Sequence, residues 1–176
     1  MSKHTDEGFM ALAYDQAEIA LNNGWIPVGA VFVRNNQVVG HGRKLGGEHK
    51  HPRLDHAELN GCNQLLWGSE GPRDLDGFEV FSTLEPCLNC MATLMTVRVS
   101  RIVWALPDPY GGGSCLLKHP EMLPDRFKSE RPIFEEGLLA ERSRLLLRKY
   151  FLSRAEKKDK NWSDPENPLV KLALSD

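Results

Sequence analysis

Apolar positions in the first quarter of the chain recur three and four residues apart, as they do along one face of a helix. Thr5 can cap this helix and Gly24 can end it. The next run, IPVGAVFVR, is apolar almost throughout, which is typical of a buried strand. Asn35-Asn36 separates it from a short run that ends at Gly40, so we expect the two runs to pair as an antiparallel hairpin.

Helix-like and strand-like patterns then alternate to the end of the chain. Residues 42–54 are rich in glycine, proline and charge and predict a loop before a helix over about 55–68. FEVFST and RIVWAL predict two strands, joined by a helix that has Pro86 in its first turn and ends near Arg98.

The last part of the chain predicts a short fifth strand over 131–134 and a long helix over 137–157. Such alternation of helices and strands favours an α/β fold. We expect one domain over residues 1–157 and a C-terminal tail over 158–176 that either docks or wanders.

Composition is compatible with this reading and adds limits to it. The chain has 176 residues, 41% of them hydrophobic and 26% charged, which suits one domain with a real core. The formal net charge is -2, so nothing in the total indicates a general polyanion binder. The N-terminus is polar, and the longest apolar run is far shorter than the roughly 20 residues of a membrane span. We therefore expect a cytoplasmic protein without a membrane partner.

Metal-competent side chains open two of the predicted helices. One starts Asp55-His56-Ala57-Glu58, and the other contains Cys87 and Cys90 as P-C-x-x-C. Residues three apart share a helix face, so both cysteines can grip one ion. Free N-H groups and the dipole at a helix N-terminus favour the thiolate that Zn²⁺ requires.

Two cysteines and His56 make three protein ligands, which is typical of a zinc site that keeps one position open for water. Glu58 then has a role, because a carboxylate beside such a water can take its proton and pass it to a leaving group. H-x-E followed by P-C-x-x-C is the signature of the zinc nucleobase deaminases. The alternative is a closed structural site whose fourth ligand is Cys62, Cys115 or His119. That alternative leaves Glu58 without a purpose.

Six stretches of the sequence resemble the cytidine and deoxycytidylate deaminase superfamily, and in particular its bacterial tRNA adenosine deaminase branch. They are IPVGAVFV, DHAE, STLEPCLNCMATL, RIVWA, LLKHPEM and FEEGLLAERSRLLL, and the resemblance runs from about Glu7 to Ser153.

The resemblance implies a three-layer α/β/α fold with a mixed five-stranded sheet, and usually a homodimer. It also implies that His56, Cys87 and Cys90 bind Zn²⁺ and that Glu58 shuttles the proton. The backbone around Ala57 and Val28 would help to seat the base.

One departure concerns base recognition. After the second strand the family typically has G-x-G-x-N, whose asparagine contacts the base, whereas this chain has Lys44 there. Lysine offers only donors, while asparagine offers a donor and an acceptor, so the substrate contact at this position differs. Arg43, Lys44, Lys50 or Arg53 could meet an anionic group of a different substrate, or they are solvated loop charges. Tyr110, in the glycine-rich loop 107–113, is a candidate for stacking on a base.

Basic side chains also gather near the C-terminus, where eight Lys or Arg residues face three acidic ones between residues 140 and 160. Such a patch could follow a tRNA backbone. A solvated, partly salt-bridged helix face is the bland alternative.

Three functions remain open on the sequence. The first is a zinc-dependent hydrolytic deaminase of adenosine in tRNA. The second is a deaminase of a free base, nucleoside or nucleotide, such as guanine or cytosine. The third is a non-catalytic module stabilised by zinc.

Overall fold

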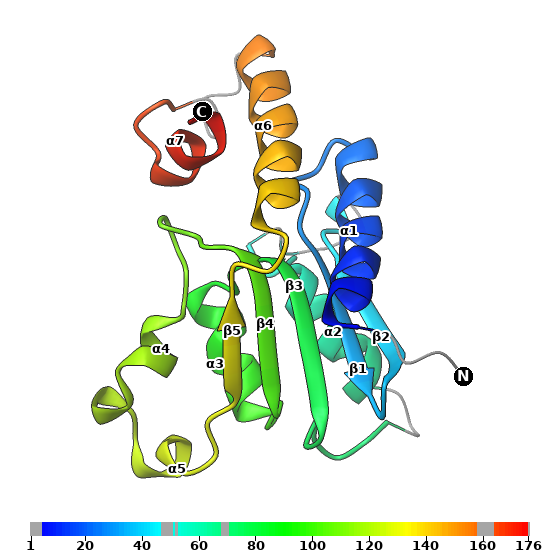
Figure 1. Cartoon of the computed structure of the whole chain (residues 1–176), viewed down its shortest axis with the longest axis vertical. Coiled ribbons are helices and arrows are strands. Elements are labelled where there is room, and N and C mark those ends of the chain that lie inside the picture. Colours follow the sequence, from blue (N-terminus) through cyan, green and yellow to red (C-terminus); the bar gives the residue numbers. More distant parts are fainter. Residues whose placement is uncertain (1–4, 47–50, 52, 68–70, 158–163, 176) are drawn as a thin grey trace.

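A mixed five-stranded sheet is the centre of the protein, which we describe from a computed structural model covering residues 5–46, 51, 53–67, 71–157 and 164–175 (Figure 1). The strands run in the order β2-β1-β3-β4-β5. β1 is antiparallel to both β2 and β3, whereas β3, β4 and β5 are parallel. Their bounds are β1 Gly29–Arg34, β2 Gln37–Arg43, β3 Phe78–Leu84, β4 Arg101–Leu106 and β5 Ile133–Glu136.

Helices cover both faces of this sheet. α2 (Ala57–Leu66) and α3 (Leu88–Thr96) pack on one face, and α1 (Asp6–Asn22) and α6 (Ala140–Glu156) contribute to the core on the other. Side chains of a strand alternate between faces, so Val80 joins the first core and its neighbour Phe81 the second. The three-layer α/β/α prediction is confirmed.

Local sequence explains the first elements. The Thr5 hydroxyl accepts a hydrogen bond from the Gly8 amide at 3.2 Å and so caps α1. Asn35 and Asn36 have φ values of 52° and 61°, as a tight hairpin turn with two left-handed residues requires. The antiparallel hairpin is confirmed, and β2 extends three residues beyond Gly40.

The two helices that carry the candidate ligands start slightly later than predicted. His56 is the N-cap of α2 and Cys87 is the N-cap of α3. Pro86 therefore lies just before the helix and not in its first turn, which corrects the prediction. Both N-cap residues have extended backbone, so each candidate ligand lies at the N-terminal end of its helix.

Four short helices were not predicted, because the spacing of apolar residues in the sequence gives no sign of them. Three short helices lie between β4 and β5, namely α4 (Cys115–Lys118), η2 (Pro120–Met122) and α5 (Asp125–Lys128). Near the C-terminus, α7 (Pro168–Leu174) is capped by Asn167 and packs beside α6 (Figure 1). Its apolar side chains share a core with Leu84 and Leu106, the last residues of β3 and β4. The division of the chain at 157/158 stays a prediction, because residues 158–163 lie outside the described part.

No helix within the described ranges has the length and apolar character that crossing a bilayer demands.

Candidate metal centre

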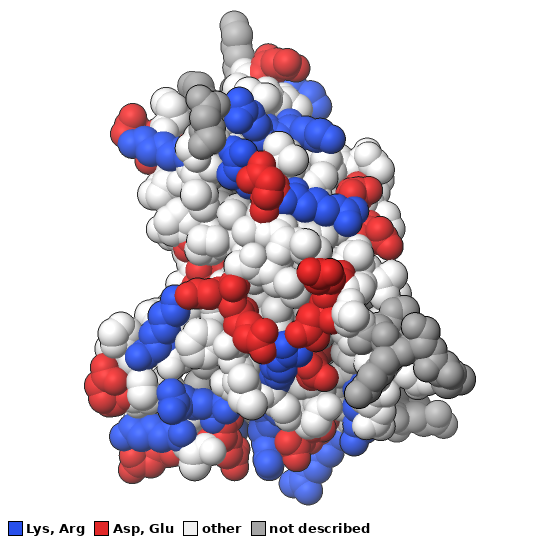
Figure 2. All heavy atoms as spheres, viewed as in Figure 1, with Lys and Arg blue, Asp and Glu red and all other residues white. Residues whose placement is uncertain are grey.

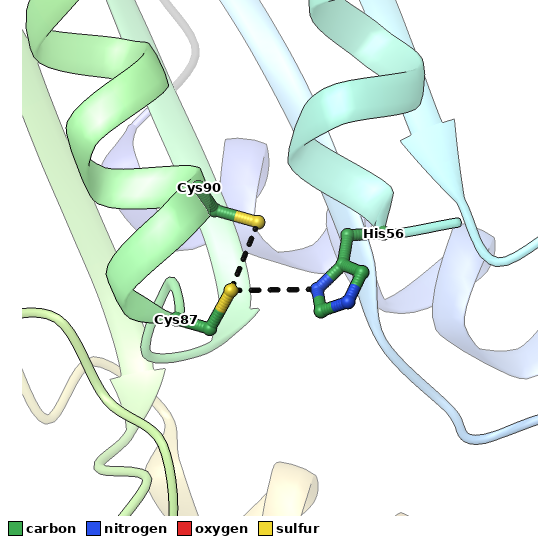
Figure 3. Close-up of side chains that lie close together, drawn as sticks. All are labelled: His56, Cys87 and Cys90. Atoms are coloured by element: carbon green, nitrogen blue, oxygen red, sulfur yellow. Dashed lines mark hydrogen bonds between the residues drawn. The ribbon is translucent and has the colours of Figure 1, made fainter. Parts of the chain in front are cut away.

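The starts of α2 and α3 meet on one face of the sheet, and His56, Cys87 and Cys90 point toward one another there (Figure 3). The His56 Nδ1 atom lies 3.6 Å from the Cys87 sulfur, and the two sulfurs are 3.4 Å apart. All three ligand atoms lie within 4.8 Å of one another. Since 31 positions separate His56 from Cys87, only the packing of α2 beside α3 creates this cluster.

These spacings fit a tetrahedral zinc ion. With Zn–S bonds of about 2.3 Å and Zn–N bonds of about 2.0 Å, tetrahedral angles place two sulfurs about 3.8 Å apart and a nitrogen about 3.5 Å from a sulfur. The observed separations of 3.4 and 3.6 Å are close to both values. One imidazole and two thiols are also the donor types that zinc prefers. His56, Cys87 and Cys90 could therefore hold Zn²⁺ with little rearrangement.

Other metal-competent side chains do not join this cluster. Cys62 is 3% exposed and belongs to the core between α2 and the sheet. Cys115 is exposed, and exposed His119 pairs with Glu121 at 3.2 Å. Within the described ranges the centre thus has three candidate ligands, which is the number for a catalytic and not a closed structural site.

The environment of the cysteines favours a thiolate. The hydrogen bond with Cys90, assisted by His56, lowers the pKa of the Cys87 thiol to about 4. That same contact, together with burial, raises the pKa of Cys90. The hydrogen bond with Cys87 also raises the pKa of His56. One thiolate is therefore present at neutral pH even before a metal displaces the remaining proton.

Glu58 lies in the first turn of α2 with its side chain directed into the protein. It is 3% exposed, and the Ser82 hydroxyl of β3 donates a hydrogen bond to its Oε1 at 2.9 Å. Burial raises the pKa of this carboxyl. A buried acid that one hydroxyl holds in place beside the cluster suits a group that moves protons. Ser82 itself was missed by the sequence interpretation, because a serine within a strand carries no local sign of its partner.

The role of Ala57 and Val28 in seating a base stays a prediction. Ala57 is the first residue of α2, and Val28 packs against the hydrophobic core that includes Ala57. Lys44, in the position of the family's asparagine, donates from Nζ to the backbone oxygen of Asp55 at 3.1 Å. Lys44 therefore lies beside the start of α2, one residue away from His56.

The glycine-rich loop after β4 runs alongside the start of α3. Gly112 forms a β-bridge with Cys87, and the Leu88 amide donates to the Gly111 oxygen at 3.1 Å. Tyr110, in the same loop, is 63% exposed. Tyr110 is thus accessible to solvent, as a stacking residue requires, and its stacking role stays a prediction.

Glu85 organises this loop and was also missed by the sequence interpretation. It is 7% exposed and accepts hydrogen bonds from the amides of Asp108 and Ser114, both at 2.9 Å. An acid directly between a buried strand and Pro86-Cys87 could have indicated such a role, since a buried carboxylate needs donors.

The basic segment near the C-terminus is largely engaged within the protein. Arg142 pairs with Glu18 at 2.9 Å, Arg144 pairs with Glu141 at 2.7 Å, and Arg154 donates to the Gly24 oxygen. On the face shown in Figure 2, basic side chains over α6 are interspersed with acidic ones. Of the two interpretations of this segment, the partly salt-bridged helix face therefore fits α6 better than a continuous basic surface that follows a tRNA backbone. Lys50, Lys158 and Lys160, which belonged to the basic candidates, lie outside the described residues.

Comparison with known proteins places this geometry in a family. A family model, the cytidine and deoxycytidylate deaminase zinc-binding region, matches residues 3–106, more than half of the chain. The chain belongs to this family. It is accordingly a zinc-dependent hydrolytic deaminase, and the alternative of a non-catalytic zinc module loses its support.

Relatives of this deaminase narrow its position within the family. It is 35% identical to tRNA-specific adenosine deaminase 2 of Xenopus tropicalis over 126 residues, 68% of this chain and 74% of the relative. It is 32% identical to the tRNA-specific adenosine deaminase of Rickettsia felis over 148 residues, 81% of this chain and 97% of the relative.

Solved structures agree with the fold. A structure from a study of A-to-I editing by tRNA:A34 deaminases has a TM-score of 0.65 and 26% identity, and covers 79% of this chain and 98% of its own. A structure in complex with 2,6-diaminopurine has the same TM-score at 18% identity, covers 83% of this chain and 81% of its own, and shows the fold alone.

Proposed function

We propose that this deaminase converts adenosine to inosine within tRNA. The supporting observation is that the likeness to the tRNA-specific adenosine deaminase of Rickettsia felis extends over 81% of this chain and 97% of that enzyme. The exposed Tyr110, in the loop that contacts the start of α3 through Gly111 and Gly112, is compatible with a base presented from a larger molecule.

In this proposal His56, Cys87 and Cys90 hold the zinc ion, which supplies Lewis acidity toward water when it is bound. Glu58 takes a proton from the attacking water and delivers it to the departing amino group. A C–O bond forms at the ring carbon, the C–N bond breaks, and ammonia leaves. Ser82 keeps the Glu58 carboxylate in place through its 2.9 Å hydrogen bond, and the backbone at Ala57 and Val28 seats the base.

A free base, nucleoside or nucleotide is the second candidate substrate, and two observations favour it. Lys44 stands where the tRNA enzymes typically have a base-contacting asparagine. Several arginines of α6 are already paired internally, which leaves less positive charge for an RNA backbone.

An ammonia-release assay over a panel of compounds tests both whether the protein deaminates and which substrate it prefers. The purified protein is incubated with a tRNA anticodon hairpin and with free bases, nucleosides and nucleotides, in parallel with Glu58→Gln. The amide keeps the size of Glu58 but cannot carry the proton, so turnover should fall at least about 100-fold while zinc is retained. Glu79→Gln is the matched control. Glu79 lies near the start of β3, away from Ser82, the strand residue that contacts Glu58, so this variant should keep its activity.

Each outcome bears on one part of the proposal. Turnover of a free base with no inosine in the hairpin would replace the tRNA substrate with the second candidate. Full activity of Glu58→Gln on the preferred substrate would contradict the assignment of Glu58 as the proton carrier.

We further propose that the protein works in the cytoplasm as a homodimer. Light scattering coupled to gel filtration tests the dimer, and a monomer mass in the active fraction would contradict it.

A further inference from the structure

A buried carboxylate lies immediately before the metal cluster and takes no part in the proposed reaction. Asp55 is 1% exposed. Its Oδ1 accepts from the Leu45 amide at 2.9 Å, and its Oδ2 accepts from the Gly46 amide at 2.7 Å. Two consecutive backbone N-H groups of the loop after β2 therefore converge on one side chain.

Two further side chains complete this arrangement. The Asn60 Nδ2 donates both to Asp55 Oδ1 and to the Arg43 backbone oxygen, each at 2.8 Å. Lys44 Nζ donates to the Asp55 backbone oxygen at 3.1 Å and lies 3.8 Å from its Oδ2. Asp55, Asn60 and Lys44 thus join the end of β2 to the first turn of α2, and we call these three residues the Asp55 clamp.

The clamp is attached directly to a candidate ligand. Asp55 precedes His56 in the chain. The backbone N-H of Asn60 donates to the His56 backbone oxygen at 2.9 Å in the first turn of α2. The His56 side chain forms no capping bond, and its backbone N-H donates to the Leu54 oxygen at 3.0 Å. The clamp residues Asp55 and Asn60 hold the chain on both sides of that bond. Gly46 lies against the Trp25 indole, where a Cβ would come within 1.8 Å of a ring atom, so the loop end of the clamp is packed as well.

We propose that the Asp55 clamp is a positioning unit that sets the place of His56 relative to Cys87 and Cys90, and thereby holds zinc in the centre. The inference rests on the ligand set in the proposed function. It also assigns Lys44 a role: its ammonium group is bound to the clamp, and it does not read the base as an asparagine would.

Asp55→Asn is the sharpest perturbation, because it keeps the shape of the side chain and changes one acceptor into a donor. If the new amino group takes the place of Oδ1, it faces the Leu45 N-H and the side-chain Nδ2 of Asn60. If it takes the place of Oδ2, it faces Gly46 N-H and the Lys44 ammonium. Either orientation sets donor against donor in a buried place, so the loop must move away and the backbone at His56 with it.

Zinc release to the chromogenic chelator 4-(2-pyridylazo)resorcinol provides a readout that does not depend on the substrate. Residues that orient a metal ligand typically change metal affinity about 10- to 100-fold, and we expect Asp55→Asn to release zinc faster by a factor in that range. The matched control is Asp6→Asn, which also removes a carboxylate hydrogen-bonded to a strong donor, Arg101, at 2.5 Å, but at the start of α1 on the other face of the sheet. All proteins are compared at the same interval below their own melting temperatures.

Faster release from Asp55→Asn, with the parent rate in Asp6→Asn, supports the clamp. The parent rate in Asp55→Asn, or equal acceleration in both variants, overturns it. If Asp55→Asn does not fold, Lys44→Met decides instead, because it keeps the aliphatic chain of this partly exposed residue and removes only its donors. Acceleration there supports the clamp, and the parent rate overturns it.

The ligand set is tested separately by the zinc content of His56→Ala. Retention of zinc by His56→Ala would contradict the ligand set. A zinc-free His56→Ala together with unchanged release from Asp55→Asn would contradict the clamp alone.

Discussion

Gly42→Ala should disable the deaminase by moving α2. Gly42 lies in β2 under the start of this helix, and a Cβ built there would be 1.9 Å from the Ala57 oxygen and 2.7 Å from the Gly61 nitrogen. Both are backbone atoms, which cannot rotate away. Real contacts of this kind need about 3 Å or more, so α2 would have to shift by about 1 Å from the sheet.

The shift matters because His56 and Glu58 stand at the start of the same helix. A misplacement of about 1 Å can cost roughly 100-fold in rate. Overpacking of this kind also typically lowers the free energy of unfolding by about 1–3 kcal/mol. We therefore expect Gly42→Ala to lose zinc more readily and to lower kcat by about 100-fold, while the protein still folds.

Gly40→Ala is the matched control on the same strand. Its Cβ would meet only side-chain atoms of Leu65, at 2.9–3.0 Å, and a leucine side chain can adjust. Zinc content by mass spectrometry, melting temperature and ammonia release are measured for both variants. Equal zinc content and equal kcat in Gly42→Ala and Gly40→Ala would refute the view that the contact of β2 with α2 sets the site.

Three further variants test other parts of the structure. Ser82→Ala leaves a buried Glu58 oxygen without its donor, which should lower kcat about 10- to 100-fold at unchanged zinc content; an unchanged kcat would remove Ser82 from the site. The hydrogen bonds from Arg101 hold the pKa of Asp6 below 3.8, so this carboxylate stabilises the fold above that pH, and its contribution is lost as the pH falls through the lowered pKa. In urea titrations the stability gap between the parent and Asp6→Asn should therefore shrink as the pH falls below about 4, and a constant gap would contradict the ion pair. Leu169→Ala, in α7, removes a side chain that is 2% exposed and should cost about 2–5 kcal/mol in unfolding free energy; an unchanged melting temperature would show that α7 does not dock as described.

Local sequence was a sufficient guide wherever neighbouring residues decide the outcome. The period of apolar residues located α1, β1, β3 and β4, and two consecutive asparagines located the hairpin turn. These features depend on backbone hydrogen bonds and sterics within a few residues. The HAE and PCxxC segments indicated zinc because each is a short local pattern that puts metal-binding side chains at the start of a helix.

Solvent exposure was harder to predict. Trp67 is a large apolar residue at the end of a helix, yet it is 82% exposed, because α2 ends at Leu66 and the tryptophan follows its last turn. Trp104, in the inner strand β4, is fully buried. An apolar residue at a helix end is thus placed by where the helix stops, which the apolar period alone does not fix.

By itself, the sequence determined the order of the five strands and of α1, α2, α3 and α6, the ligand types and the reaction class of this deaminase. Only the tertiary structure decided that the start of α2 meets the start of α3, that Ser82 and Glu58 pair, and that Lys44 turns toward Asp55. Such contacts join residues 11 to 31 positions apart, and their geometry depends on how whole helices pack against the sheet. A short motif encodes the donors of a site, whereas the packed layers set the distances between them.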